Sequence, residues 1–302
     1  MRDLEVLHGD ALEQLRLLPA GLARTCVTSP PYWGLRDYGV GGQVGLEASP
    51  EEWCARLVEV FGEVRRILAD DGTLWLNVGD CYAGNAGGGQ WAKRGAGLKS
   101  KDLIGLPWML AFALRAGGWY LRCDIVWSKP NPMPESVTDR PTRSHEFLFL
   151  LSKQRRYYYD ADAIREPCEQ PASRGLRAGV SRDDYDARKW KDRSDGKSRP
   201  PMTMRDREYN PRGRNKRSVW EIATQATPEA HFATFPDELV RPCVRAGSAP
   251  GDRVLDPFAG TATVGMVAAV EGRRFVGVEL NPEYVEMARR NLHGLGIQGV
   301  LL

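Results

Sequence analysis

Residues 254–265 read Val-Leu-Asp-Pro-Phe-Ala-Gly-Thr-Ala-Thr-Val-Gly, and this stretch decides the fold. The apolar residues predict the end of a buried strand, the small residues after Asp256 predict a turn, and a helix is expected over 261–270. A second strand follows at 275–278, and Glu279 stands at its end, 23 residues after Asp256. Such a βαβ unit is typical of nucleoside binding, because the turn admits a ligand to the helix N-terminus and the carboxylate can accept both ribose hydroxyls.

The chemistry of this turn bears on which nucleoside it binds. The G-x-G-x-x-G pattern of nicotinamide dinucleotide sites is absent from the turn. Asp256 would repel a pyrophosphate, whereas its carboxylate suits a positively charged ligand such as S-adenosylmethionine, which carries sulfonium and ammonium groups. A nicotinamide-dependent oxidoreductase is therefore the competing hypothesis from another enzyme class.

A second turn that could face a ligand is predicted at Ser29-Pro30-Pro31-Tyr32, directly after the strand-like residues 25–28. Pro31 has no backbone N–H, and each proline drives the residue before it toward extended geometry, so the turn is stiff. Ligands of open α/β sheets bind at the carboxyl ends of strands. The turn offers a hydroxyl, a free carbonyl and an aromatic ring there, which suits a flat ring that bears an amine.

Strands and helices alternate along most of the 302 residues. The alternation predicts an α/β, Rossmann-like fold with a mostly parallel twisted sheet and helices on both faces. Ser49, Pro50 and Glu52 together predict a helix start with a capping box, and Asp71-Gly72 predicts its end. Further helices are expected over residues 11–18, 103–114 and 282–292, and regular structure is expected over 235–244.

Charge is distributed unevenly along the chain. Lys and Arg outnumber Asp and Glu by 19 to 11 in residues 151–220, whereas the rest of the chain has 23 against 28. Hydrophobic periodicity also disappears after Lys153. A basic block in an otherwise acidic chain predicts contact with a polyanion. The glycine-rich residues 84–101 are expected to form a mobile loop of unassigned role.

Composition excludes several classes of protein. The hydrophobic content is 42%, the mean hydropathy is −0.43, and no run of 18 apolar residues that could cross a membrane occurs. The chain opens with a mixed, acidic segment in place of a signal peptide. Six cysteines occur without a C-x-x-C pair, so neither a disulfide framework nor a metal site is expected. We expect a cytoplasmic protein, encoded by a bacterium or a phage.

Several motifs of this chain resemble those of DNA amino-methyltransferases. Ser29-Pro30-Pro31-Tyr32 resembles their catalytic motif, residues 256–260 resemble their Asp-Pro-Phe-x-Gly cofactor motif, and residues 277–280 resemble their ribose-binding strand. Ala262 departs from the family, which commonly has a second glycine there. The catalytic turn precedes the basic region, which precedes the cofactor turn. This order is similar to that of the β group, a circular permutation of the common methyltransferase order.

The resemblance implies a role for each matching segment. Residues 1–153 would form the catalytic half of the methyltransferase domain, 154–217 a basic target-recognition region, and 218–302 the cofactor-binding half. The catalytic residues would be Ser29, Pro30, Pro31 and Tyr32. The residues that bind S-adenosylmethionine would be Asp10, Thr28, Thr234, Phe235, Asp256, Pro257, Phe258, Gly260, Thr261, Glu279, Leu280 and Asn281. The candidates for DNA contact are Lys129, Arg143, His145, Arg212, Arg214 and Lys216, and no residue is assigned to a metal.

These roles imply a sequence-specific DNA methyltransferase. The Ser29 hydroxyl and the Pro30 carbonyl would accept the two hydrogens of an exocyclic amine, and Tyr32 would stack on a base extruded from the duplex. Cytosine N4 is the favoured target because Ser-Pro-Pro-Tyr resembles the cytosine enzymes most, and adenine N6 is the alternative. Double-stranded DNA is the expected partner, with a cognate restriction endonuclease and a homodimer as further expectations. A non-catalytic nucleic-acid-binding protein and an RNA substrate stay open.

Overall fold

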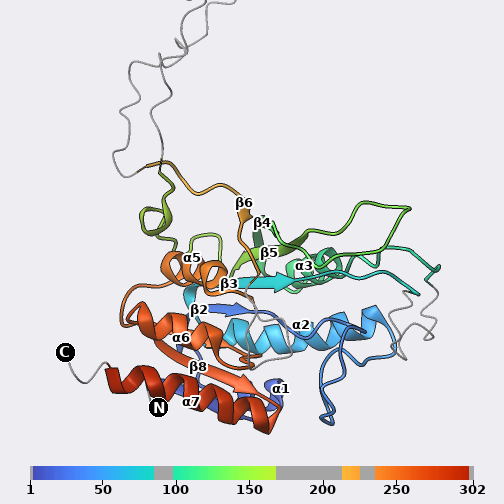
Figure 1. Ribbon diagram of the computed structural model, residues 1–302. Helices are drawn as coiled ribbons and strands as arrows, with labels where there is room; N and C mark the ends of the chain where they lie inside the picture. Colours follow the sequence, from blue (N-terminus) through green and yellow to red (C-terminus); the bar gives the residue numbers. More distant parts are fainter. Residues whose placement is uncertain (1–2, 85–97, 168–212, 225–234, 299–302) are drawn as a thin grey trace, which may run out of the picture. The chain divides into compact units, whose positions relative to one another are not determined.

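The fold is built on a sheet that has eight strands within the residues that the structure describes (Figure 1). The computed structural model describes residues 3–84, 98–167, 213–224 and 235–298. The strands lie in the order β1-β8-β7-β2-β3-β5-β4-β6. Their bounds are β1 Leu4–His8, β2 Ala23–Thr28, β3 Leu68–Val78, β4 Tyr120–Ser128, β5 His145–Ser152, β6 Val219–Glu221, β7 Arg253–Asp256 and β8 Arg274–Glu279. Neighbouring strands are parallel except where β5 pairs with β3 and β4, which confirms the mostly parallel, Rossmann-like sheet.

Helices cover both faces of this sheet. One layer consists of α1 (Ala11–Leu17), α2 (Pro50–Ile67) and α3 (Leu106–Ala116), and the other of α5 (Asp237–Gly247), α6 (Thr263–Val270) and α7 (Pro282–Gln298). A short 3-10 turn spans Asp162–Ile164. Successive strand residues point to opposite faces, so Cys26 and Leu255 join the core under α1 to α3, while Val27 and Val254 are buried toward the other layer. Strands buried on both faces explain their nearly continuous apolar sequences.

The predicted start of α2 forms with one shift in its capping bonds. The Ser49 hydroxyl accepts the Glu52 N–H at 3.2 Å, and Pro50 occupies the first turn. Glu52 reaches back to the N–H of Ala48 at 3.1 Å, one residue before the cap. The predicted end at Asp71-Gly72 is wrong, because α2 ends at Ile67 and β3 begins at Leu68.

Other helix boundaries also differ from the sequence expectation. α6 begins at Thr263 and not at Thr261, because Ala262 before it has a left-handed backbone with φ +67°. α3 begins three residues later than expected, because Leu103 pairs with Tyr82 and Asp80 accepts the N–H groups at the helix start. α1 ends one residue earlier, at Leu17. α5 and α7 extend to Gly247 and Gln298.

The chain divides into two compact units, one of residues 1–163 and 217–302 and one of residues 164–216. Residues 154–163 belong to the larger unit, where Tyr158 N–H donates to Asp71 and Asp160 N–H donates to Ala246. Tyr159 stacks on Trp75 with ring centroids 6.4 Å apart. In the smaller unit, Glu166 pairs with Arg214 in a backbone bridge. Residues 85–97 of the expected glycine-rich loop lie outside the described residues.

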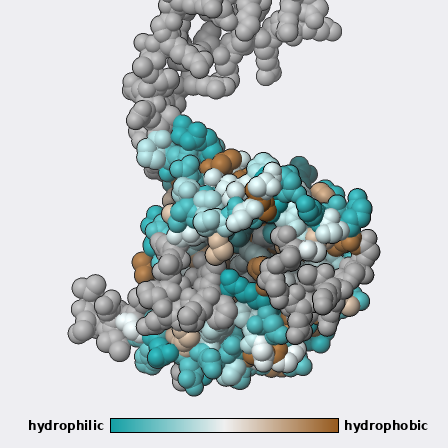
Figure 2. All heavy atoms as spheres, turned by 45° about the vertical axis from the view of Figure 1, so that its right-hand side comes forward, coloured by the Kyte–Doolittle hydropathy of each residue, from teal (hydrophilic) through white to brown (hydrophobic). Residues whose placement is uncertain are grey.

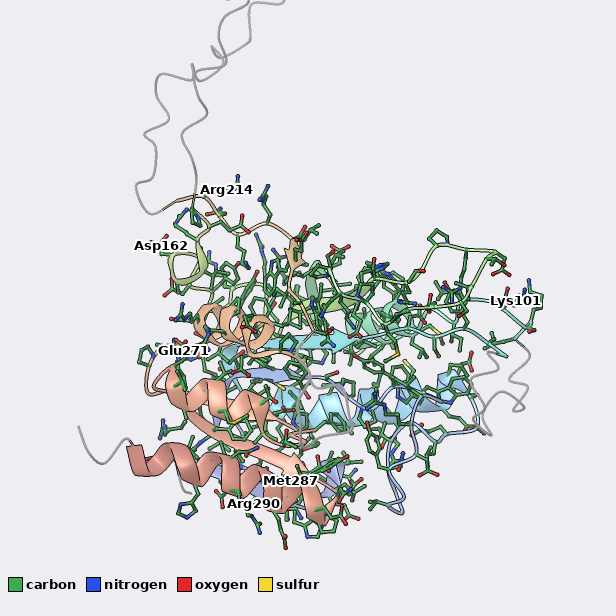
Figure 3. The ribbon with its side chains drawn as sticks, viewed as in Figure 1. Lys101, Asp162, Arg214, Glu271, Met287 and Arg290 are labelled. Atoms are coloured by element: carbon green, nitrogen blue, oxygen red, sulfur yellow. The ribbon has the colours of Figure 1, made fainter. Side chains whose placement is uncertain are left out.

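The surface of the larger unit shows how the helices are joined. Glu271, which is labelled in Figure 3 and follows α6, lies beside α5. It accepts hydrogen bonds from Arg241 and Arg245 of α5 and so ties the two helices together. Figure 2 shows hydrophobic side chains scattered among hydrophilic ones on the face it displays. Among the helices of the described ranges, none is long and apolar enough to cross a membrane.

Two helical glycines should respond oppositely to the same substitution. Gly62 lies exposed inside α2 with open space around its Cα, so Gly62→Ala should raise the free energy of unfolding by about 0.5–1 kcal/mol. Gly265 lies buried inside α6, where a Cβ would stand 2.7 Å from Cδ1 of Phe275. Gly265→Ala should therefore lower that free energy by about 1–3 kcal/mol through overpacking.

Urea denaturation followed by circular dichroism checks both glycine variants. Because each substitution adds one methyl group within a helix, helix propensity alone predicts the same sign for both. A stabilised Gly265→Ala variant would contradict the packing of α6 against β8.

Candidate active site

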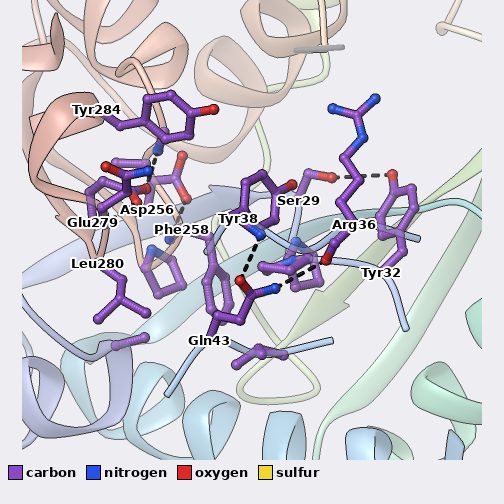
Figure 4. Close-up of a pocket in the computed structure, with 18 of the residues that line it drawn as sticks. Ser29, Tyr32, Arg36, Tyr38, Gln43, Asp256, Phe258, Glu279, Leu280 and Tyr284 are labelled. Carbon is purple, nitrogen blue, oxygen red and sulfur yellow. Dashed lines mark hydrogen bonds between the residues drawn. The ribbon is translucent and has the colours of Figure 1, made fainter. Parts of the chain in front are cut away.

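The carboxyl ends of β1, β8, β7 and β2 meet at one edge of the sheet, because these four strands are parallel neighbours. A cavity of about 370 Å³ opens at this edge, a size typical of ligand sites. The predicted residues that line it are Asp10, Ser29, Pro30, Pro31, Tyr32, Lys129, Phe235, Asp256, Pro257, Phe258, Gly260, Thr261, Glu279, Leu280 and Asn281. The structure thus brings the predicted catalytic turn and the predicted cofactor turn into one pocket (Figure 4).

Several predicted site residues do not line the cavity. Thr28 is buried beside it. The side chain of Arg143 lies 3.8 Å from Asp80, and His145 packs against Phe147, where burial lowers the pKa of the imidazole. Arg214 and Lys216 belong to the smaller unit, where both pair with Glu166. Thr234 and Arg212 lie outside the described residues.

Asp256 is a buried carboxylate at the end of β7. Its Oδ1 accepts the Thr28 hydroxyl at 2.6 Å and the Phe258 N–H at 3.0 Å. Burial raises the pKa of Asp256 to about 7, although these hydrogen bonds oppose the shift. Because burial makes the ionised form of this carboxylate unfavourable, a cation bound beside it would be stabilised.

Glu279 holds the cofactor turn together. Its two oxygens accept the N–H groups of Gly260 at 2.9 Å and Asn281 at 2.7 Å. Burial raises the pKa of Glu279 above its ordinary value. A carboxylate has about four lone-pair sites, more than its backbone donors use, so Glu279 can still accept a hydroxyl.

Ala262 takes the left-handed conformation that glycine adopts more easily, and its backbone precedes α6 without a side-chain cap.

Asp10 has a structural bond in addition to its place in the cavity. Its Oδ1 accepts the Glu13 N–H at 3.1 Å and thereby caps α1. Arg56 lies 3.5 Å from its other oxygen, Oδ2. Both observations explain a carboxylate here without a ligand, so the role in binding adenine that the family resemblance implies is still a prediction.

One wall of the cavity was not predicted from the sequence. The segment after the catalytic turn folds back so that Arg36, Tyr38 and Gln43 line the pocket. The Gln43 amide accepts the Tyr38 N–H at 2.7 Å and donates to the Arg36 carbonyl at 3.0 Å. Tyr38 meets Tyr284 edge to face, with ring centroids 6.4 Å apart. No helix or strand pattern marks this wall, because local side-chain bonds of Gln43 and the distant contact of Tyr38 with Tyr284 place it.

The catalytic turn is fixed by bonds from several elements. The Trp53 indole donates to the Pro31 carbonyl at 2.9 Å. The Tyr32 ring packs so closely on Gly79 that a Cβ there would lie 2.6 Å from the ring. The Ser29 and Tyr32 hydroxyls lie 3.2 Å apart (Figure 4). Burial and the Glu146 carboxylate raise the pKa of Tyr32 well above its ordinary value, so its hydroxyl keeps the proton.

Two further pocket residues were not among the predicted site residues. Glu146, the second residue of β5, accepts the Tyr32 hydroxyl on Oε2 at 2.9 Å and forms an ion pair with Lys129 through Oε1. The Asn77 amide donates to the Tyr32 hydroxyl and to Glu146 Oε2, both at 2.9 Å. Among the described residues nothing donates to its buried Oδ1. A polar residue inside the apolar strand 73–78 was the available signal for Asn77.

Comparisons with known proteins agree with this arrangement. The chain is 49% identical over 96% of its length to the type II methyltransferase M.Cfr9I of Citrobacter freundii, of which 87% is covered. A putative DNA modification methylase from Thermus thermophilus, solved in complex with S-adenosyl-L-methionine, is 25% identical, with a TM-score of 0.59 and coverage of 97% of this chain and 95% of that one.

A third relative shares the fold. The cytosine-N4-specific PvuII DNA methyltransferase has a TM-score of 0.65 at 19% identity, with coverage of 96% of this chain and 86% of that one. The family model described as DNA methylase, for the N6 and N4 enzymes, matches residues 23–290 and so includes both turns of the pocket. This protein therefore belongs to the N6/N4 DNA methylase family.

Proposed function

We propose that this protein methylates the exocyclic N4 of a cytosine that is flipped out of DNA, with S-adenosylmethionine as the methyl donor. The observation that carries the proposal is that one cavity joins the Ser29-Pro30-Pro31-Tyr32 turn to the carboxylates Asp256 and Glu279. The first group suits an amine on a flat ring, and the second suits a cationic nucleoside. Membership of the DNA methylase family supports both halves of the proposal.

The residues of the cofactor half fit S-adenosylmethionine by their charge. Asp256 is buried and Glu279 is partly buried, and both carboxylates have raised pKa values, so a cation placed beside them would favour their ionised forms. The lone pairs left on Glu279 suit ribose hydroxyls, and Phe258 and Leu280 supply apolar surface. When bound, S-adenosylmethionine supplies a methyl group activated by its sulfonium.

The base half of the pocket acts by positioning. An exocyclic amine is a poor nucleophile because its lone pair is delocalised into the ring. Acceptors on its two hydrogens, Ser29 Oγ and the Pro30 carbonyl, would aim the nitrogen lone pair at the methyl group, and near-attack geometry supplies most of the rate. Tyr32 offers a ring face to the base, a stacking contact worth about 1–3 kcal/mol.

The choice of cytosine rests on Ser29 as the first residue of the catalytic turn. Adenine N6 is the alternative product, and the same two acceptors would serve its amine. A cognate restriction endonuclease and a homodimer are still expectations from sequence.

Expression in a bacterial host that lacks DNA methylation tests the proposal. Digested DNA should contain N4-methylcytosine by nucleoside mass spectrometry, and sequencing of the modified DNA should map the recognition site. N6-methyladenine would keep the reaction and change the base. If a folded protein that binds S-adenosylmethionine gave neither product, DNA amine methylation would be rejected.

Ser29→Ala should remove one acceptor from the amine. We expect transfer to fall at least about a hundredfold, with S-adenosylmethionine affinity nearly unchanged, because Ser29 lies on the base half of the pocket. Single-turnover methylation assays and titration calorimetry measure the two quantities separately. Near-normal transfer by the variant would show that Ser29 does not hold the amine.

Affinity for S-adenosylmethionine should depend on pH through Asp256. Its pKa in the free protein is about 7, and a cation binds the ionised form, so affinity should be full above that pH and fall below it. Between pH 8 and pH 6 the dissociation constant should rise about tenfold. Asp256→Asn should bind more weakly at pH 8 and lose this dependence. Calorimetric titrations of both proteins across this range would contradict the assignment if the two profiles were parallel.

A further inference from the structure

The hydrogen bonds around Ser29 have a definite direction, and Glu146 sets it. Ionised Glu146 can only accept hydrogen bonds, since the Lys129 ammonium holds it through Oε1. Only 18% of either side chain is exposed, so the pair is largely shielded from water. Oε2 therefore fixes the proton of the nearest hydroxyl, which is that of Tyr32 at 2.9 Å.

The Tyr32 hydroxyl has one proton and two lone pairs. Its proton goes to Glu146, and one lone pair accepts the Asn77 amide at 2.9 Å. Toward Ser29, 3.2 Å away, the Tyr32 oxygen can then offer only a lone pair. The Ser29 hydroxyl must therefore be the donor in that bond. One of its lone pairs faces the Asn77 amide at 3.5 Å, which leaves the other for the pocket.

We propose that Glu146 is a positioning residue that makes Ser29 a hydrogen-bond acceptor and so selects a base that bears an exocyclic amine. The inference rests on the proposed function and adds a source of specificity to it. The amine presents N–H groups, one of which the remaining Ser29 lone pair accepts. A base with a carbonyl at the same position presents only lone pairs, which Ser29 in this state repels.

Glu146→Gln should remove this fixed direction with little change in shape. Lys129 attracts the oxygen of the new amide to the place of Oε1, so its NH2 group takes the place of Oε2 and faces Tyr32. Tyr32 then accepts from that group, so its own proton is released from position 146 and turns toward Ser29 or toward the Asn77 amide. The Ser29 oxygen is then no longer held as an acceptor, and its hydroxyl is free to donate to a carbonyl.

The experiment compares binding of two DNA duplexes by fluorescence anisotropy, without cofactor. One duplex carries the target base at the mapped recognition site, and the other carries its carbonyl analogue, uracil for cytosine or hypoxanthine for adenine. The wild-type protein should prefer the amine about tenfold or more, and Glu146→Gln should reduce that preference at least about fivefold. Its kcat should also fall, while its affinity for S-adenosylmethionine stays the same.

A matched control distinguishes a change in hydrogen-bond direction at Ser29 from the mere loss of an ion pair. Glu271→Gln also removes a carboxylate bonded by basic residues, Arg241 and Arg245, but lies outside the cavity and should keep the wild-type preference. Should Glu146→Gln not bind S-adenosylmethionine, Tyr32→Phe carries the test, because it removes the link to Ser29 and keeps the Lys129–Glu146 pair. It should also reduce the preference.

An unchanged amine preference in a folded variant would overturn the role of Glu146. That result differs from failure of the proposed function, in which the wild-type protein itself would produce no methylated base in DNA.

Discussion

The pairing of β2 with β7 is the constraint on which the rest of the site depends. Thr28 and Asp256 are 228 residues apart in the chain, yet the parallel pairing of β2 with β7 brings the ends of the two strands together. The Thr28 hydroxyl donates to Asp256 at 2.6 Å, so the last residue of one strand supports the last residue of the other. The catalytic turn follows the first strand and the cofactor turn follows the second. This pairing therefore brings the turn proposed to hold the methyl acceptor and the turn proposed to hold the methyl donor into one cavity.

The two halves of the cavity recognise their ligands by different physical means. The cofactor half uses charge, since burial raises the pKa values of Asp256 and of the partly buried Glu279, and both gain from a nearby cation. The base half uses the direction of hydrogen bonds, since Glu146 and Lys129 neutralise each other and leave little net charge beside Ser29. A neutral base would be stabilised little by a nearby charge, and a cation would be stabilised little by an oriented hydroxyl. The means of recognition in each half therefore suits the ligand proposed for it, the cation in the cofactor half and the neutral base in the other.

Features formed by residues close together in the chain could be predicted from the sequence, whereas contacts between residues far apart in the chain could not. Pro30, Pro31 and Gly260 shape their turns within a few residues, so both turns could be found in one sequence. The start of α6 was missed because Ala262 takes a left-handed conformation that its residue type does not favour. Glu146 was missed because its contact with Tyr32 joins residues 114 apart in the chain and depends on the pairing of β2 with β3 and of β3 with β5, which sequence periodicity does not report.

The antiparallel strand β5 explains how Glu146 reaches the active edge. Every parallel strand of the sheet brings its carboxyl end there, so its first residues lie at the opposite edge. β5 runs the other way between β3 and β4, and Ser128 at the end of β4 is paired with His145 at its start. Were β5 parallel, Glu146 would lie about 20 Å away along its eight residues. Because β5 is antiparallel, Glu146 near its start lies at the same edge of the sheet as the two turns, which follow the ends of β2 and β7.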